Sequence, residues 1–362
     1  MPTNPTASTP ATAKAPAAPK PPPNATGVTA DTFKRLTPDV AAGKLPEKDA
    51  QMLAVQSARP GVIGEAQAIT AARKAAALPP ADRAQFQQAV DGGKSDTERA
   101  FLYKALAAGH PVSEIADFAK QIQGLSDKEL LRDYTLSGPL GTEETPGLHQ
   151  QFTQSCVPSV AETLRGDADP IYAGNVHAQN EDVHYNMQVD NRSLASEEKK
   201  LLEGTGGGRA VPFTSAAGGG GVPTQSGKID DVLNSVSKQT GLTYHQSHLD
   251  KNNRRASPAQ EALVDQMAAQ LQQGIPTPFE VRSPDDTRGH EALAIAVEGS
   301  VENEDQRFLV HDPGTGETAW LSRREFLFGT DQFGGGWQHY GLAGVALAQE
   351  QLPPEPQAAA GR

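Results

Sequence analysis

The only cysteine among the 362 residues is Cys156, and two groups that could act with it follow later in the chain. His290 opens one apolar segment, and Asp312 ends the next. A cysteine, a histidine and a carboxylate, each at the edge of a predicted element, suggest a thiol nucleophile, its base and the group that orients the base. A lone cysteine is usually a core residue. The ordered set of three therefore carries the chemical prediction.

The neighbours of Cys156 predict that it opens a helix. Ser155 is a natural N-cap, and Pro158 is tolerated in the first turn. A helix N-terminus and an adjacent imidazole both favour the ionised, reactive form of a thiol. We expect His290 to supply the imidazole and Asp312 to accept a hydrogen bond from the other ring nitrogen.

Acyl transfer also needs hydrogen-bond donors directed at the oxyanion that forms during the reaction. The backbone N–H of Cys156 is one candidate, and the side-chain amide of Gln150, six residues earlier, is another. Gln151 and Gln154 compete with Gln150 for this role. The residues by themselves leave the choice open.

Taken together, these motifs resemble the papain-like cysteine peptidases, above all their bacteriocin-processing branch, whose pattern runs Gln, Cys-Gly-Pro, His and Asp-Pro-x-x-Gly. The corresponding positions are Gln150, Cys156-Val157-Pro158, His290 and Asp312-Pro313-Gly314-Thr315-Gly316. The resemblance covers residues 140–345. It implies a papain-like fold, an oxyanion role for Gln150 and hydrolysis of peptide bonds through Cys156, His290 and Asp312, without a cofactor. Val157 replaces the glycine of the family, and the segment between Cys156 and His290 is long, so the type of substrate stays open.

Two other functions stay open. The first would use the same three residues for catalysis, and the second would not use them. A glutamine deamidase or transglutaminase would use the same thiol, imidazole and carboxylate. A non-enzymatic interaction protein would bind through its helical region and keep Cys156 in the core. A disordered head, a helical middle and a papain-like end are also similar to the layout of secreted bacterial effector proteases, which is an analogy of architecture.

Composition divides the chain into four parts. Residues 1–30 are rich in Pro, Ala and Thr and predict a disordered tail, and residues 349–362 predict a second one. Residues 31–138 predict a helical domain, because apolar residues recur at three- and four-residue spacing. Residues 139–348 predict the papain-like peptidase domain, with a Gly-rich loop at 204–228.

The elements within these parts predict an α+β fold, with helices first and an antiparallel sheet after them. We expect helices at 49–55, 65–78, 81–90, 95–106, 112–122, 126–131, 156–165, 228–240 and 257–271, and a helical turn at 322–327. We expect strands at 278–282, 292–297, 307–311 and 318–321.

The resemblance implies a protein or peptide substrate, and charge and hydropathy argue against two other kinds of partner. The formal charge of -12 and the absence of a basic stripe argue against nucleic acid. No apolar run approaches the roughly 20 residues of a membrane-spanning helix. The start of the chain lacks the basic and apolar parts of a secretory signal, so we expect a cytoplasmic protein or one secreted by a non-classical route.

The histidines outside the Cys156 set do not predict a metal site. His177 and His184 are seven residues apart, and His245 and His248 are three apart, but neither pair has a convincing further ligand. We expect them to be exposed helix or loop residues. His311 is adjacent to Asp312, so in a strand it should point to the opposite face and stay outside the site.

Overall fold

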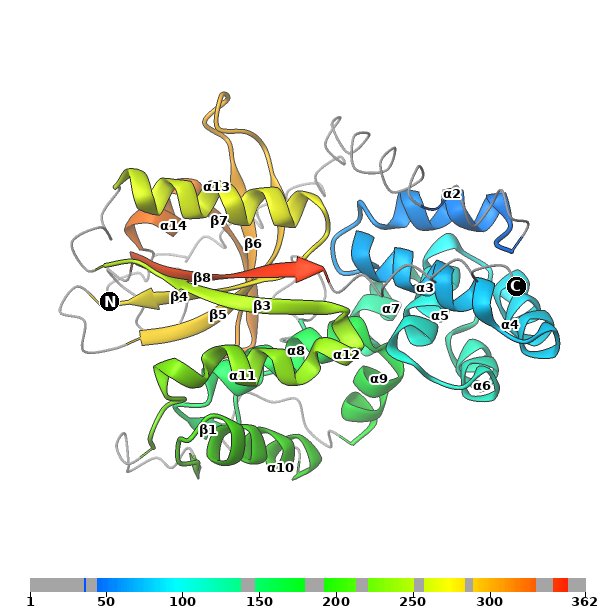
Figure 1. Ribbon diagram of the computed structural model, residues 1–362, viewed down its shortest axis with the longest axis horizontal. Coiled ribbons are helices and arrows are strands. Elements are labelled where there is room, and N and C mark those ends of the chain that lie inside the picture. The colour runs from blue at the N-terminus through cyan, green and yellow to red at the C-terminus, as the bar shows by residue number, and fades with distance from the viewer. Residues whose placement is uncertain are drawn as a thin grey trace, which may run out of the picture.

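The computed structural model describes residues 36, 44–137, 147–179, 192–212, 221–250, 257–283, 289–329 and 341–350. The tail predicted at 1–30 lies outside these residues, as do nearly all of the tail at 349–362 and the centre of the Gly-rich segment at 204–228. The described part is α+β, as predicted: a helical region is followed by helices and an antiparallel sheet (Figure 1).

The helical region packs its apolar faces into one core. Its helices are α2 (Glu47–Gln56), α3 (Glu65–Ala77), α4 (Pro80–Gly92), α5 (Asp96–Ala108), α6 (Val112–Ile122) and α7 (Asp127–Asp133). All six were predicted, with ends displaced by a few residues. Phe86 and Tyr103 meet edge to face in the core, and the Tyr103 hydroxyl donates a hydrogen bond to buried Asp49. The six helices therefore share one closely packed hydrophobic core.

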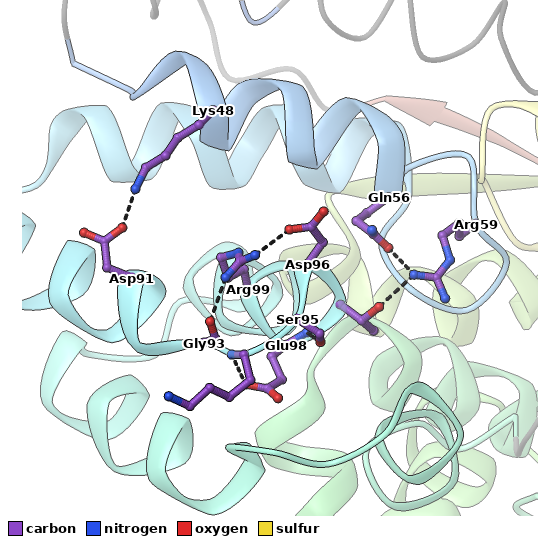
Figure 2. A network of polar contacts seen from close by, with 11 residues as sticks. Lys48, Gln56, Arg59, Asp91, Gly93, Ser95, Asp96, Glu98 and Arg99 are labelled. Carbon is purple, nitrogen blue, oxygen red and sulfur yellow. Dashed lines mark hydrogen bonds and ion pairs between the residues drawn. The ribbon is translucent and has the colours of Figure 1, made fainter.

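Polar contacts connect the solvent-facing ends of these helices (Figure 2). Ser95 caps α5 by accepting from the Glu98 backbone, as predicted. The Glu98 carboxylate, however, accepts from the backbone N–H of Lys94 and of Gly124 instead of closing a capping box. Lys48 pairs with Asp91 at 2.5 Å on the surface, where solvent screens the attraction between the two charges.

The second region is built on a six-stranded antiparallel sheet in the order β3-β8-β4-β5-β6-β7. The strands are β3 (Leu242–His248), β4 (Thr277–Arg282), β5 (Gly289–Glu298), β6 (Arg307–Asp312), β7 (Glu317–Ser322) and β8 (Gly341–Glu350). The four predicted strands are present. Strands β3 and β8 were not predicted. They lie side by side, with β3 at the edge of the sheet and β8 between β3 and β4.

Helices cover both faces of this sheet. In Figure 1, α13 (Pro258–Gln272) lies above it, and α8 (Cys156–Ala168) and α11 (Ile229–Leu233) lie below it. Val157 and Val160 of α8 pack on Leu293 and Ile295 of β5. The helix that begins at the cysteine is therefore fixed against the strand that begins at His290.

The prediction of one continuous helix at 228–240 is wrong. The segment divides into 3-10 turns and two short helices, α11 and α12 (Ser237–Thr240). The Asn234 side chain holds this segment to β3, because it donates to the Tyr244 carbonyl at 2.9 Å and accepts from the Tyr244 N–H at 2.6 Å. At the break, the Ser235 hydroxyl donates to the Val232 carbonyl at 2.6 Å, and a local bond of this kind competes with helix formation.

Three further elements were not predicted: α9 (Pro170–Ala178), α10 (Arg192–Lys200) and a two-stranded pair of β1 (Phe152–Thr153) with β2 (Val211–Pro212). The remaining helix, α14 (Arg323–Phe328), has the capping box predicted at Ser322 and Glu325. Within the described residues, no helix combines the length and apolar character needed to cross a membrane.

Candidate active site

Cys156 is the first residue of α8 and is partly exposed. Ser155 occupies the N-cap position as predicted, but its hydroxyl makes no cap. It instead donates to the Phe152 carbonyl at 2.7 Å, across a turn in which Gln154 has a φ of 69°. This turn brings the chain sharply into α8, so the first backbone N–H groups of the helix remain directed outward from its N-terminus.

His290 and Asp312 lie at the ends of neighbouring strands, β5 and β6. The His290 Nε2 is 2.7 Å from Asp312 Oδ1, and the Asp312 side chain is 1 % exposed. The same carboxylate oxygen accepts from the Gly314 N–H at 2.7 Å. The tight turn after β6 thus holds the carboxylate in the direction of the imidazole.

Gly314 packs closely against both members of the His290–Asp312 pair. A Cβ at this position would lie 3.0 Å from Asp312 Oδ1 and 3.2 Å from His290 Cε1. The Asp-Pro-x-x-Gly pattern therefore does more than form a turn, because its first glycine leaves room for the imidazole beside the carboxylate.

Cys156 lies near enough to His290 to act on its imidazole. Burial by itself would lower the pKa of His290, but the charge and hydrogen bond of Asp312 and the nearby Cys156 raise it to about 9. Nε2 is engaged by Asp312, which leaves Nδ1 for the sulfur. The fold thus places Cys156, His290 and Asp312, which come from three distant segments of the chain, in one region.

Gln150 lies beside the turn that follows Asp312. Its backbone N–H donates to the Pro313 carbonyl at 2.6 Å, and its buried side-chain amide donates to the Phe152 carbonyl at 3.0 Å. Of the competing residues, Gln151 directs its amide to the His149 carbonyl, and Gln154 is exposed. Gln150 is therefore the glutamine that is both buried and held against the Asp312 turn.

A buried carboxylate that the sequence analysis missed holds the segment before Cys156. Glu198 of α10 is fully buried and accepts hydrogen bonds from the backbone N–H groups of Gln151 and Phe152. Burial raises the pKa of Glu198 to about 8, and hydrogen bonds with Ser155 and the two backbone groups limit the rise. In the sequence, Glu198 stands in the charged run Glu197-Glu198-Lys199-Lys200, which reads as a solvated helix face.

Glu291 is a second buried carboxyl group that the sequence did not reveal. It pairs across the strands with Glu280, and one of its oxygens has no hydrogen-bond partner. Burial, the charge of Glu280 and the nearby Cys156 raise the pKa of Glu291 well above its usual range. A carboxyl group that burial shifts toward its neutral form therefore lies in the surroundings of the thiol.

The other histidines have structural contacts. The His177 Nε2 is 2.7 Å from the Thr135 carbonyl, and His184 lies outside the described residues. His245 and His248 are in strand β3 instead of a helix or loop, and His248 hydrogen-bonds to Glu280 at 3.0 Å. Among the residues that the structure describes, no group of three or more His, Cys, Asp or Glu side chains is arranged to hold a metal ion.

His311 is buried and contacts the chain that leads to Gln150. Its Nε2 donates to the Leu148 carbonyl at 2.9 Å, and burial lowers its pKa, which keeps the ring neutral. It is directed away from the His290–Asp312 pair, as the alternation of side chains along a strand predicts.

Comparison with known proteins gives no relative: no family model, no curated protein and no solved structure matches this chain.

Proposed function

We propose that this protein is a cysteine-dependent hydrolase, and specifically a papain-like peptidase that cleaves peptide bonds. One observation carries the proposal: Cys156, at a helix N-terminus, lies near enough to His290 to act on its imidazole, and His290 contacts the buried carboxylate of Asp312 at 2.7 Å. Enzymes use this arrangement for acyl transfer: a nucleophile contacts a base, and the base contacts a group that orients it.

The first half of the reaction follows from these contacts. With its pKa raised to about 9, His290 is protonated at neutral pH and stabilises negative charge on the Cys156 sulfur. The sulfur forms a bond to the substrate carbonyl carbon, and the π electrons of the carbonyl move to its oxygen. The tetrahedral intermediate then expels the amine, which takes the Nδ1 proton of His290 as the C–N bond breaks.

Hydrolysis of the acyl-enzyme completes the cycle. His290, now neutral, removes a proton from water, and the oxygen of that water displaces the sulfur from the acyl carbon. Asp312 keeps the hydrogen on Nε2 throughout, so that Nδ1 exchanges protons with the sulfur, the amine and the water.

Two donors support the oxyanion in this account. The Cys156 N–H is at the first position of α8, where no carbonyl of the preceding turn of helix is available. The Gln150 amide has two hydrogens, and the Phe152 carbonyl accepts only one. The second hydrogen can donate to an oxyanion, which is the role that Gln150 has in the resemblance to papain-like peptidases.

The test is the fate of protein substrates incubated with the full chain, followed by intact-mass spectrometry. We expect peptide-bond cleavage, and its loss in Cys156→Ala and in His290→Gln. His177→Gln is the matched control and should retain full activity. Loss of ammonia or cross-linking without chain cleavage would replace the peptidase by a glutamine deamidase or transglutaminase. Cleavage that persists in Cys156→Ala would exclude both.

A further inference from the structure

A cavity of about 600 Å³ lies between the helical region and the sheet. The segment between α2 and α3 lines one part of the cavity, and the last turn of α8 lines another. The segment between α13 and β4 and the end of β5 line the rest. Cavities of this size at the junction of two structural units are where proteins commonly bind small molecules.

Two buried, oppositely charged side chains line this cavity without forming an ion pair. Lys104 of α5 is 2 % exposed, and Asp167 of α8 is 7 % exposed. The charge of Asp167 acts on Lys104, yet no contact within 4.0 Å joins the two groups in the part of the chain that the structure describes. A direct pair would be the usual way to bury such charges.

Each of these two side chains retains hydrogen-bonding capacity. The Lys104 ammonium has three donors; one donates to the Gly61 carbonyl at 3.1 Å, and the ammonium also lies over the Phe101 ring, 4.9 Å from its centroid. One carboxylate oxygen of Asp167 accepts from Leu136 and Ser137, and the other is buried without a partner. Buried polar atoms without partners are costly, by about 1–3 kcal/mol each.

Most of the other charged residues around the cavity are engaged elsewhere. Arg59 pairs with Asp127, and Glu298 pairs with Arg307. Glu65 is also buried at the cavity and has an interaction of its own, although its Oε1 accepts no hydrogen bond. The apolar part of the lining includes Leu242, Ile275, Ile295 and Val297. The cavity thus combines the Lys104 ammonium and the Asp167 and Glu65 carboxylates with aliphatic surface.

We propose that this cavity binds a small zwitterion with an apolar side chain, which is the chemistry of an apolar amino acid. Its carboxylate would bind Lys104, its ammonium would bind Asp167, and its side chain would contact the aliphatic wall. A ligand with both charges bridges the two groups and satisfies both, whereas a ligand with one charge leaves the other group buried and unpaired.

The proposed site is distinct from the candidate active site. Asp167 lies eleven residues after Cys156 in the same helix, which corresponds to about 16 Å along the axis. The proposal therefore does not depend on the function proposed for Cys156.

Isothermal titration calorimetry of the full chain with leucine, methionine and phenylalanine tests this proposal. We expect saturable one-to-one binding of at least one of them. Leucinamide lacks the carboxylate and 4-methylpentanoate lacks the ammonium, and each should bind at least about tenfold more weakly than leucine, because one buried charge stays unpaired.

Matched variants locate the binding. Lys104→Met and Asp167→Asn should each weaken binding, since each removes one charge, and asparagine keeps an oxygen for Leu136 and Ser137. Lys120→Met and Asp117→Asn change an exposed pair on α6 and should bind as the unchanged protein does. If Lys104→Met does not fold, the two ligand analogues still decide. The absence of saturable binding for all three amino acids, or unchanged binding in folded Lys104→Met and Asp167→Asn, would overturn the proposal.

Discussion

His290 has an anionic neighbour at one ring nitrogen and a thiol nearby, and these two neighbours favour its protonation. The sequence predicted the three partners because each stands at an element edge within a short motif. It could not predict Glu198 or Glu291, since a carboxylate in a charged run or at the start of a strand gives no sign of burial. Only the tertiary packing of α10 and of the β4–β5 pair shows that these two groups are buried beside the site.

Replacing Asp312 by asparagine should lower the pKa of His290. Burial lowers this pKa and Asp312 raises it, so loss of the charge should move it down from about 9 by about one unit or more. NMR titration of the His290 Cε1 proton measures the change. Asp117→Asn serves as the control, and an unchanged His290 titration in Asp312→Asn would contradict the assignment.

The same protonation predicts an alkaline limit to activity. If the amine leaves with the proton of His290, kcat/KM should fall as the pH rises through about 9. In Asp312→Asn the fall should occur at lower pH, in step with the NMR titration. A profile whose alkaline limb is the same in both proteins would show that His290 is not the acid.

Glu198 should act as a positioning residue for the segment that carries Gln150. Glu198→Ala removes the acceptor for the Gln151 and Phe152 N–H groups, and the segment should shift. Displacements of about 1 Å can lower turnover by up to about 100-fold, so we expect a fall in kcat with a smaller change in KM.

Glu197→Ala is the matched control for this prediction, because the neighbouring Glu197 contacts Arg165 and Tyr172 instead of the segment. Glu198→Gln keeps one acceptor oxygen and should recover part of the rate. A fall in kcat of equal size in Glu197→Ala would mean that Glu198 contributes general stability alone.

The helices and strands that could be predicted are those with a clear periodic pattern of apolar residues. The six helices from α2 to α7 have apolar residues at helical spacing, and all were predicted. Strand β3 reads Leu-Thr-Tyr-His-Gln-Ser-His, with too few apolar residues to stand out, and β8 is rich in Ala and Gly, which have low β-propensity. Both strands form because neighbouring strands supply their hydrogen bonds.

His110 connects two elements of the structure. Its ring bridges Glu114 and Asp169, the N-cap of α9. The hydrogen bond with Asp169 raises the pKa of His110 to about 9. Since this exceeds the unfolded value of about 6.5, the contribution to stability is complete below pH 6.5 and is lost as the pH rises through 9.

His110→Ala should therefore destabilise the protein at pH 6 by about 1.5–3 kcal/mol, the range for hydrogen bonds to a charged group, and by much less at pH 10. Urea denaturation at the two pH values measures the difference. A destabilisation independent of pH would show that His110 acts through packing alone.

Across the whole molecule, the helical region and the sheet meet through close backbone contacts. Gly274, which follows α13, has a φ of 69°, and a Cβ there would lie 2.8 Å from the Ser57 carbonyl oxygen after α2. Gln67 of α3 also donates to the Ala168 carbonyl at the end of α8. Such contacts between segments far apart in the chain could not be predicted from local patterns, and they bind both regions into one structure (Figure 1).

Gly274→Ala should lower the free energy of unfolding by about 2 kcal/mol, because the left-handed backbone costs alanine about 1–2 kcal/mol and the Ser57 carbonyl leaves no room. Gly92→Ala is the control, since its Cβ would meet no atom within 4 Å. Urea denaturation followed by far-UV circular dichroism measures both. Equal stability of the two variants would contradict the close contact.

The alkylation rate of Cys156 is the most direct test of whether His290 activates the thiol. Iodoacetamide is added to the full chain at pH 6.5, and intact mass follows modification of the only cysteine in the unchanged protein and in His290→Gln, Asp312→Asn and His177→Gln. We predict a rate lower by roughly tenfold or more in His290→Gln, a smaller fall in Asp312→Asn, and no change in His177→Gln. The same rate in all four proteins would contradict the account.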